Sequence, residues 1–500
     1  MRGRKITLNA VAGLSLHLVM IIYNFIFPRL VMQIYGSSVN GLLQSITQFL
    51  SYIALLDAGV SAVIRVKLYK PLADGDLKMI QRIVNSAKDF YKKISYSFVA
   101  YTAVIAIILP FTYKAHFDFG YVLVLILIIA ISTFAEYFFG ISYTVLLEAD
   151  QCKYISYLIQ IISVIFNIIA VVILIKFRLS IHLVKLATAF IFAMRPIVLA
   201  LYCRRRYRFT PNNKALEPIQ NKWVGFGHHI AYFLHTHTDI VILTFVKGPL
   251  VVSVYSVYSM IINALQTLLG YISGGIEAAF GNMIAKREKE NLAKGLKVYE
   301  MAIFSLTTTF FSTAAVTIFG FVKVYTAGVK DVDYIIPNAA IILIFAEVVH
   351  CLRKPYEAVV MAAGLLKETM KGAFIETGLN LGISIILVWR YGIVGVAVGT
   401  LVAMLFRTIQ YTVFVSENVV IRPLAEVLTK MMLFVALFFT LYLIGNKVSF
   451  VCNSYLAWFG WAVCVFMISG ICVLILDYIV FRNELKYFIS YGKNLLKSRR

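Results

Sequence analysis

Long apolar runs alternate with short polar links along the whole chain. A membrane-spanning helix needs roughly 20 apolar residues, and fourteen stretches of the sequence approach that length. The predicted spans cover residues 7–31, 38–63, 94–114, 119–146, 155–176, 182–203, 223–246, 250–279, 299–322, 336–362, 372–390, 393–415, 430–446 and 455–481. This pattern predicts an all-α polytopic membrane protein.

The composition supports a membrane location. Of the 500 residues, 61% are hydrophobic and only 14% are charged, and the mean hydropathy is +0.84. A soluble chain of this length would need more charge to cover its surface. The net charge of +23 would suggest nucleic-acid binding in a soluble protein. Here the basic residues lie mainly in the links between spans, so no nucleic-acid partner is expected.

The distribution of basic residues predicts the orientation. When the termini and alternate links are counted together, one side of the membrane holds 33 Lys and Arg residues and the other holds 8. Cytoplasmic links are enriched in Lys and Arg. We therefore expect a multi-pass protein of the bacterial cytoplasmic membrane with both termini in the cytoplasm. No cleavage site follows the first apolar run, so we interpret it as a retained span.

The polar links differ in character. Residues 65–93 and 281–298 have amphipathic patterns, which predict helices that lie at the membrane surface. Residues 203–222 combine an arginine-rich run with Pro211-Asn-Asn, which predicts a flexible connector. The six cysteines form no CxxC pair, so neither a disulfide framework nor a zinc site is expected.

Four short matches recur in the same order along the chain, which indicates an internal repeat. Residues 56–63, 134–136, 149–153 and 194–197 match residues 272–279, 345–347, 363–367 and 406–409, at offsets of 216, 211, 214 and 212. The matches predict two homologous six-span halves, and transporters with such repeats bind substrate at the repeat interface.

This repeat divides the chain into four parts. They are an N-terminal lobe (1–207), a connector (208–222), a C-terminal lobe (223–416) and two extra spans with a basic tail (417–500).

Many ionisable residues fall inside the predicted spans. Each costs at least about 2.5–3.5 kcal/mol on insertion scales, so by default it faces a partner or a cavity. The set comprises Arg29, Asp57, Glu136, Lys185, Arg195, Asp239, Glu277, Glu347, Arg353, Lys354, Glu357, Glu376 and Arg407. For Arg29, Asp57, Lys185 and Glu277, a position near the lipid headgroups is equally consistent with the sequence.

Polar stripes at helical spacing predict a hydrated lumen. One stripe on the second span runs from Asn40 to Ser51, and its counterpart on the eighth span runs from Ser256 to Gly270. Arginines at equivalent positions of the two halves could hold an anionic head group through paired hydrogen bonds. The candidate substrate-binding residues are Arg29, Asn40, Gln44, Gln48, Arg195, Asn263, Gln266, Arg353 and Arg407. Hydrogen bonding between packed helices and snorkelling of the arginines remain the alternatives.

Histidines and carboxylates suggest ion coupling. His228, His235 and Asp239 share one face of the seventh span with Tyr232, and His and Asp can carry protons near neutral pH. The candidate coupling residues are Asp57, Glu136, His228, His235, Asp239, Glu347 and Glu376. Coupling to H⁺ or Na⁺ is left open, as is a packing role for the histidines. No third metal ligand stands out, so no bound metal or other cofactor is expected.

Motifs of bond-making chemistry are missing from the sequence. It contains no GxxxxGK[ST] loop, GxSxG or HExxH, so we expect a transporter and not an enzyme. The predicted outer loops are short, which disfavours a glycan polymerase or a membrane glycosyltransferase.

Several runs resemble the Wzx-type polysaccharide flippases of bacteria. They are residues 35–53, 55–60, 68–73, 147–151, 238–242 and 252–260, within a likeness that covers nearly the whole chain. Such flippases are similar to a superfamily that includes the MATE exporters and the lipid II flippase. The resemblance implies two six-helix lobes in a V around a central cavity, plus two extra helices.

The resemblance also implies a substrate and partners. The substrate would be an undecaprenyl-pyrophosphate-linked oligosaccharide, moved outward through membrane lipid by alternating access for capsule or exopolysaccharide assembly. A polysaccharide polymerase and chain-length machinery would then act on the product. A MATE-like drug or cation exporter is the alternative.

Overall fold

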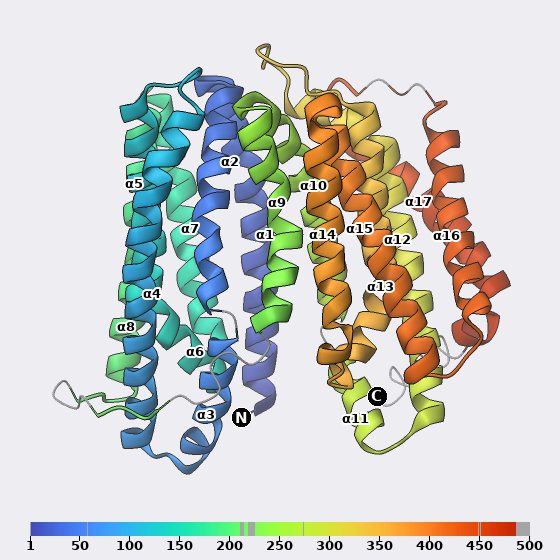
Figure 1. Cartoon of the computed structure of the whole chain (residues 1–500), viewed down its shortest axis with the longest axis horizontal. Helices are drawn as coiled ribbons and strands as arrows, with labels where there is room; N and C mark the ends of the chain where they lie inside the picture. The colour runs from blue at the N-terminus through green and yellow to red at the C-terminus, as the bar shows by residue number, and fades with distance from the viewer. Residues whose placement is uncertain are drawn as a thin grey trace. The chain divides into compact units, whose positions relative to one another are not determined.

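The computed structural model describes residues 2–57, 59–210, 215–218, 226–273, 275–448, 450 and 452–486. Side chains at 2–3, 226–229, 231–232, 234–236 and 271–273 lie outside this description. Over the described ranges every regular element is a helix (Figure 1).

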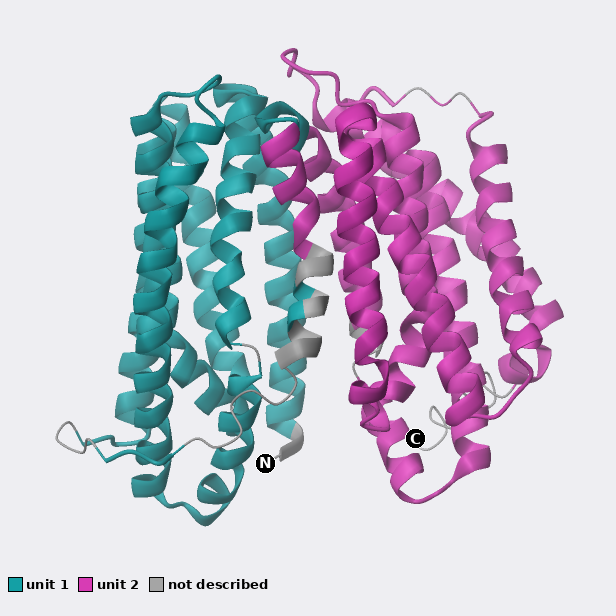
Figure 2. Cartoon of the chain, in the orientation of Figure 1, with its two compact units in different colours: residues 1–233, 247–253 teal, residues 234–246, 254–500 magenta. Residues whose placement is uncertain are grey.

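The chain forms two compact units (Figure 2). Unit 1 comprises Met1–Phe233 and Lys247–Ser253, and unit 2 comprises Leu234–Val246 and Val254–Arg500. The predicted lobe boundaries near residues 207, 222 and 416 stay predictions.

Unit 1 contains the first eight α-helices and two irregular helical segments. They are α1 (Arg2–Tyr35), α2 (Ser37–Ser51), the 3₁₀ segment η1 (Tyr52–Asp57), α3 (Val60–Asp74), α4 (Leu77–Thr112), α5 (Phe119–Ala135), the π-helical segment η2 (Glu136–Gly140), α6 (Ile141–Ala149), α7 (Lys153–Lys176) and α8 (Ile181–Arg206). Two further helices, α9 (Phe226–Val246) and α10 (Pro249–Ser273), are divided between the units.

Unit 2 contains the remaining helices. They are α11 (Ile276–Ala285), α12 (Lys289–Tyr325), α13 (Pro337–Ala362), α14 (Leu366–Tyr391), α15 (Ile393–Asn418), α16 (Leu424–Gly445) and α17 (Tyr455–Val480).

The same packing pattern recurs in both units. In unit 1, α5 and α7 both pack against α8, while α4 packs against α3 and α5. In unit 2, α13 and α14 both pack against α15, while α12 packs against α11 and α13. Helices α16 and α17 have no counterpart in this pattern and pack against α12. The recurrence agrees with the order of the sequence matches.

Twelve helices among the described residues are long and apolar enough to cross a membrane, compared with fourteen predicted spans. Of the other two predicted spans, α13 is helical but does not meet that standard, and α9 is only partly described. Helix α13 carries Glu347, Arg353, Lys354 and Glu357, which is too much charge for an apolar span. In α9, only His237–Val246 qualifies, as a shorter apolar helix.

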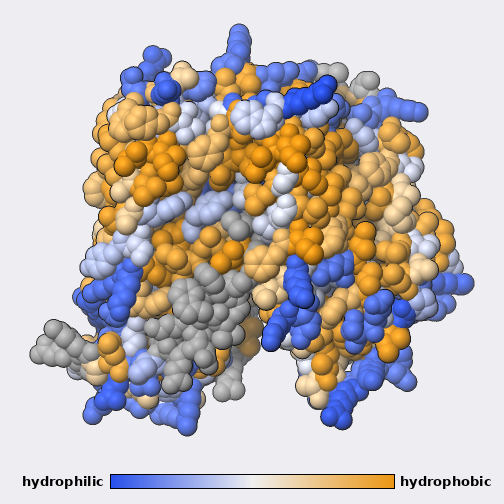
Figure 3. Space-filling model, in the orientation of Figure 1, coloured by the Kyte–Doolittle hydropathy of each residue, from blue (hydrophilic) through white to orange (hydrophobic). Residues whose placement is uncertain are grey.

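Apolar side chains cover the middle of each unit. In the view of Figure 3 they gather along the helical body, and hydrophilic residues gather at the ends. On α7, Ile162 and Phe166 are 59% and 65% exposed, and on α14, Ile386 is 73% exposed. Such surfaces fit hydrocarbon, because the exposed side chains are apolar and a helix within the membrane bonds its backbone polar groups internally.

The predicted surface helices are only partly correct. Within 65–93, α3 ends at Asp74, and α4 then runs without interruption from Leu77 into its membrane span. Likewise, α12 begins at Lys289, inside the second link. Both long helices therefore extend beyond their apolar stretches. Of the helices in or beside these two links, α3 and α11 are the short separate ones (Figure 1).

The described parts of the connector are fastened to α4. The Gln81 side chain donates to the Thr210 carbonyl oxygen at 2.6 Å and accepts from the Thr210 amide at 3.3 Å. The Glu217 amide donates to the Ser86 hydroxyl at 2.7 Å. These parts are therefore attached to α4, and the flexibility of the connector stays a prediction. Pro211 and its neighbours up to residue 214 lie outside the described residues.

Candidate functional site

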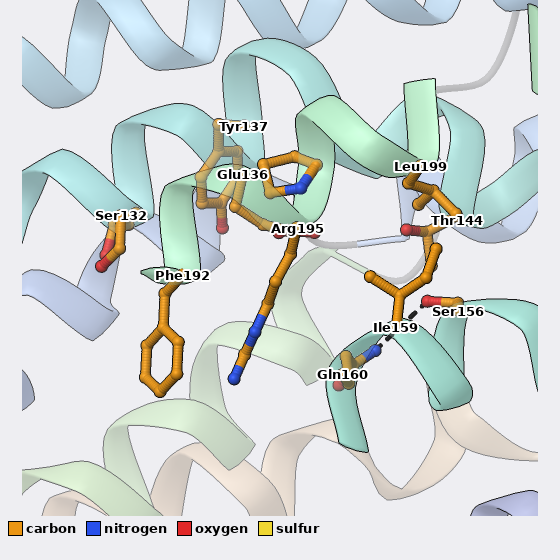
Figure 4. Close-up of a pocket in the computed structure, with 12 residues that line it drawn as sticks. Ser132, Glu136, Tyr137, Thr144, Ser156, Ile159, Gln160, Phe192, Arg195 and Leu199 are labelled. Atoms are coloured by element: carbon orange, nitrogen blue, oxygen red, sulfur yellow. Dashed lines mark hydrogen bonds between the residues drawn. The ribbon is translucent and has the colours of Figure 1, made fainter. Parts of the chain in front are cut away.

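Unit 1 contains a cavity of about 310 Å³ among its own helices (Figure 4). Its walls come from α5, η2, α6, α7 and α8. The lining residues are Ser132, Thr133, Glu136, Tyr137, Thr144, Ser156, Ile159, Gln160, Phe192, Arg195, Pro196 and Leu199. Most of them carry polar atoms, so the cavity suits water or a polar ligand more than a lipid chain.

The π-helical segment places Glu136 at this cavity. Single π turns inside α-helices occur frequently at functional sites. Gly140 ends the segment at a close crossing, where an added Cβ would lie 2.7 Å from the Pro196 Cβ and 2.9 Å from the Glu136 Oε1. The missing side chain thus lets α8 approach and leaves room for the carboxylate.

Arg195 is the cation of the cavity. Its Nε and Nη2 atoms are buried and have no hydrogen-bond partner, and its guanidinium carbon lies 3.7 Å from the centre of the Phe192 ring. Figure 4 shows the side chain extending between Phe192 and Gln160, with the guanidinium pointing away from Glu136 in this view. No carboxylate of a described residue forms an ion pair with it, so the guanidinium is available to an anionic ligand.

The opposite wall offers neutral hydrogen-bonding groups. The Gln160 side-chain amide donates to the Ser156 hydroxyl at 3.2 Å, so its carbonyl oxygen remains an acceptor. Ser132, Thr133 and Thr144 add hydroxyl groups around the cavity. Hydroxyl and amide groups of this kind can bind the hydroxyls of a sugar.

The predicted arginines of unit 2 have different surroundings. The Arg353 Nη1 lies 2.6 Å from the Glu376 Oε1, and the Arg407 Nε lies 3.4 Å from the Glu376 Oε2. Arg407 also donates to the Thr369 carbonyl at 2.8 Å and to the Tyr411 hydroxyl at 2.9 Å. The arginines are 3% and 2% exposed. They form a buried charge network with Glu376.

The repeat explains this difference. At the offset of 212 that relates Arg195 to Arg407, Glu376 of the second half corresponds to Val164 of the first half. Val164 is fully buried on α7 and cannot neutralise a cation. The first half therefore keeps the arginine but lacks the carboxylate that occupies the equivalent arginine in the second half.

A second polar cluster surrounds Asp239 in unit 2. The Asp239 Oδ2 accepts from the Tyr255 hydroxyl at 2.7 Å and from the Thr400 hydroxyl at 3.1 Å, and Asn380 donates to Thr400 at 3.2 Å. The Asp239 Oδ1 and the Asn380 Oδ1 are buried without a hydrogen-bond partner.

This cluster can hold a small cation. One carboxylate and several neutral oxygens suit a hard monovalent cation or a proton. By contrast, no group of three His, Cys, Asp or Glu residues that could hold a metal ion occurs within the described ranges.

Glu347 lies in a smaller network of the same unit. Its Oε1 lies 3.2 Å from the His350 Nδ1, which also lies 3.3 Å from the Gln266 Nε2. Glu347 and His350 are 7% and 5% exposed. Gln266 therefore contacts a buried histidine–carboxylate pair, which the stripe analysis did not predict.

The predicted polar stripes divide into packed and open positions. Asn40 is 1% exposed and donates to the Ser253 hydroxyl at 2.8 Å, so it packs α2 against α10 within unit 1. Gln44 and Gln48 on α2 are half-buried, and Asn263 on α10 is exposed. Amide groups left open on apolar spans indicate contact with water or a polar ligand.

The remaining candidate residues differ in their surroundings. Arg29 on α1 is half-buried and interacts with other residues. Asp57 accepts from the Tyr91 hydroxyl at 2.8 Å and the Ser61 hydroxyl at 3.0 Å. The side chains of His228 and His235 lie outside the described residues.

Residues 147–151, which contribute to the family resemblance, fasten helix ends in unit 1. Asp150 pairs with Lys5 at 3.0 Å and Arg206 at 3.2 Å, and it accepts from the Tyr207 hydroxyl at 2.7 Å. Burial opposes the charge of Asp150, but the bonds from Tyr207 and Lys5 and the Arg206 charge hold its pKa below the ordinary value. Glu148 similarly binds Arg65 at 3.2 Å. This motif is structural.

Sequence reasoning did not single out several residues that the structure brings into these sites. Thr400 binds Asp239 and lies seven residues before Arg407, on the same face of α15. That spacing could have identified it. Phe192 lies three residues before Arg195, which is also helical spacing. The partnership of Tyr255 with Asp239 depends on packing between helices and has no such signal.

Solved structures, and not sequences, show what this chain is similar to. Neither a protein-family model nor a curated protein sequence matches the chain. The lipid II flippase MurJ, in an inward closed conformation, is 14% identical with a TM-score of 0.66, over 95% of this chain and 100% of that one. An inward-facing multidrug resistance MATE family transporter of the MOP superfamily is 12% identical with a TM-score of 0.62, over 82% and 98%.

A third similar structure is a MOP superfamily transporter from Pyrococcus furiosus. It is 12% identical with a TM-score of 0.52, over 85% of this chain and 96% of that one. Its description reports a binding pocket of reverse polarity and suggests a different function for that protein. Taken together, these likenesses show that the chain has the fold of the MOP superfamily transporters. This fold agrees with the all-α polytopic membrane protein that the helices indicate.

Proposed function

We propose that this protein is a flippase that moves undecaprenyl-pyrophosphate-linked oligosaccharides from the inner to the outer leaflet of the bacterial cytoplasmic membrane. The product would serve capsule or exopolysaccharide assembly, with a polymerase and chain-length machinery acting after it. The fold shared with a lipid II flippase and the resemblance to Wzx-type sequences both support this function. In this proposal both termini are cytoplasmic, and access to the substrate alternates between the two sides.

The observation that carries the proposal is the unpaired guanidinium of Arg195. A buried charged group without hydrogen-bond partners is unfavourable by several kcal/mol. A diphosphate would satisfy it, because guanidinium binds phosphate oxygens through two parallel hydrogen bonds. Arg353 and Arg407 already have a carboxylate partner in Glu376. Arg195 is therefore the arginine best suited to hold the head group.

The other cavity groups fit the sugars of the same substrate. Gln160 and the hydroxyls of Ser132, Thr133 and Thr144 line the cavity beside Arg195. The half-buried amide of Gln44 on α2 adds a further polar group to the same unit. A polar path is needed because a diphosphate cannot cross hydrocarbon unaided.

The Asp239 cluster supports ion coupling. Its two unpartnered oxygens, on Asp239 and Asn380, could bind Na⁺, and the carboxylate could take up a proton. Binding there would favour one conformation only if the cluster has a different affinity in the other. We assign the coupling role to Asp239 and not to Glu376, whose charge already serves two arginines.

A MATE-like exporter of cationic drugs is the second candidate, because Glu136 lines the same cavity as Arg195. A carboxylate attracts organic cations, whereas an unpaired guanidinium repels them. The Pyrococcus transporter is described as having reversed pocket polarity, so pocket charge is a feature on which proteins of this fold can differ. The Arg195 guanidinium, which forms no ion pair with Glu136, favours the anionic substrate.

The direct test measures translocation in proteoliposomes. The purified protein is reconstituted with a fluorescent polyprenyl-diphosphate oligosaccharide, and a membrane-impermeant reductant reports the exposed leaflet. We expect Arg195→Met to slow translocation about 10- to 100-fold, which corresponds to the loss of hydrogen bonds to a charged group. Arg205→Met is the matched control, because Arg205 is an exposed arginine on the same helix.

The outcomes separate the candidates. Loss of lipid translocation in Arg195→Met with normal activity in Arg205→Met supports the proposal. Wild-type protein that exports a fluorescent organic cation and does not move the lipid would contradict it and favour the exporter.

A further inference from the structure

Lys185 is a second cation on α8 that has no role in the site described above. Its ammonium nitrogen lies 4.0 Å from the centre of the Phe27 ring. No carboxylate among the described residues forms an ion pair with it. A lysine within a membrane span without an acidic partner is unfavourable unless it faces water or a ligand.

Lys185 and Arg195 lie on one face of α8. The positions Lys185, Thr188, Phe192, Arg195 and Leu199 alternate by three and four residues, which is one helical stripe. Phe192, Arg195 and Leu199 line the cavity. Lys185 therefore extends the cavity-lining face toward the end of α8 at Ile181, about 15 Å from Arg195 by the rise of a helix.

Aromatic rings connect the two cations. The Tyr23 ring lies 5.6 Å from the Phe27 ring and 6.4 Å from the Phe192 ring. Phe27 lies under Lys185, and Phe192 lies under Arg195. The series of side chains from one cation to the other is thus continuous within unit 1, and the carboxylate beside it is that of Glu136, which lines the cavity at the Arg195 end.

We infer that Lys185 is a second binding station for the diphosphate, which passes from Arg195 to Lys185 during translocation. This inference rests on the proposed function and orientation, in which the Ile181 end of α8 faces outward. Arg195 can hold the phosphates through two parallel bonds. Lysine is a compact and strongly hydrated charge that does not fix the geometry of its ligand. It therefore suits the station from which the head group is released into water.

A second binding station makes release of the tightly bound head group easier. A head group that is bound tightly at a single point must leave it unaided, and tight binding slows that step. A second cation about 15 Å farther along the helix offsets part of this cost, because the charge of the diphosphate is compensated at both ends of the path. The aromatic rings between the stations provide flat surfaces for sugar rings.

The test separates binding from translocation in the reconstituted full-length protein. The fluorescent polyprenyl-diphosphate oligosaccharide is the probe, and its affinity is measured in nanodiscs. We expect Lys185→Met to bind the probe within about twofold of wild type but to translocate it about tenfold more slowly, a loss of roughly 1.4 kcal/mol in the transition state. Arg195→Met should weaken binding itself.

Two controls and one substitute variant make the result decisive. Lys185→Arg keeps the charge and should restore most of the rate. Lys176→Met removes an exposed lysine near the same end of unit 1 and should behave as wild type. If Lys185→Met does not fold, Lys185→Gln carries the same test.

Several results would overturn the inference. Translocation at the wild-type rate in Lys185→Met would mean that the lysine only reaches the lipid headgroups. An equal loss of binding and translocation that Lys185→Arg does not restore would indicate a structural role. Failure of the wild-type protein to move the probe would instead refute the proposed function, and this inference with it.

Discussion

Three arginines at membrane depth have surroundings that differ in one decisive way. Arg353 and Arg407 share the carboxylate of Glu376, whereas Arg195 has an aromatic ring and a polar cavity beside it. Because all three are buried or half-buried, their charges must be compensated. In unit 2 the protein supplies the compensating charge. In unit 1 Glu136 lines the same cavity but forms no ion pair with Arg195, and we propose that a ligand supplies the compensating charge.

Neutralising Glu376 should therefore destabilise the protein, although Glu376 contacts no ligand in this account. The variant Glu376→Gln leaves two buried guanidinium groups without the carboxylate that forms ion pairs with them, and we expect a loss of about 3–5 kcal/mol of unfolding free energy. Thermal unfolding in detergent micelles measures it. Arg195→Met removes an unpaired charge and should not lower stability. Equal stability of Glu376→Gln and wild type would show that the network is not needed.

Helices were the elements most accurately predicted. The spans predicted at 182–203 and 393–415 correspond to α8 (Ile181–Arg206) and α15 (Ile393–Asn418) within three residues at each end, because lipid fixes the length of an apolar helix. The prediction failed where a helix continues beyond the membrane. Helices α4 and α12 begin in polar sequence, and hydropathy records only where the apolar stretch begins.

The ends of helices are held by charge clusters, and the cluster at Asp150 predicts a pH dependence. The pKa of Asp150 lies below its ordinary value of 3.8 in the folded protein, because Tyr207 and Lys5 bond to it and Arg206 lies beside it, despite its burial. The ionised carboxylate therefore stabilises the fold above about pH 4, and this contribution is lost as the pH falls through the lowered pKa.

We accordingly expect Asp150→Asn to lower the free energy of unfolding by about 2 kcal/mol at neutral pH. The difference from wild type should shrink in acid, below the ordinary pKa, and unfolding midpoints across the pH range measure it. Asp89→Asn is the control, because Asp89 forms an exposed pair with Lys93 and such pairs contribute little. A difference that stays constant into acid would contradict the ionic role of Asp150.

At the scale of the whole molecule, the sequence predicted a repeated architecture and a basic set of buried charges. It could not predict that the two halves surround their equivalent arginines differently. Arg195 and Arg407 occupy equivalent positions, and Glu376 packs against the second one only. Such a difference depends on contacts between helices that are distant in sequence, for which a single sequence gives no signal.

The same asymmetry predicts where a coupling ion acts. In our proposal, Arg195 of unit 1 binds the substrate and the Asp239 cluster of unit 2 binds the coupling ion. Sodium ions should therefore stabilise the wild-type protein more than choline ions do. At a concentration ten times the dissociation constant, the gain is about 1.4 kcal/mol. Asp239→Asn should abolish this gain and the response of translocation to a sodium gradient.

Asp477→Asn is the control, because it alters another buried carboxylate, which accepts a hydrogen bond from Ser305 at 2.6 Å. It should leave the stabilisation by Na⁺ and the response to the sodium gradient intact. A protein driven by a proton gradient and insensitive to Na⁺ would assign Asp239 to proton transfer, and a rate independent of both gradients would exclude coupling at this cluster.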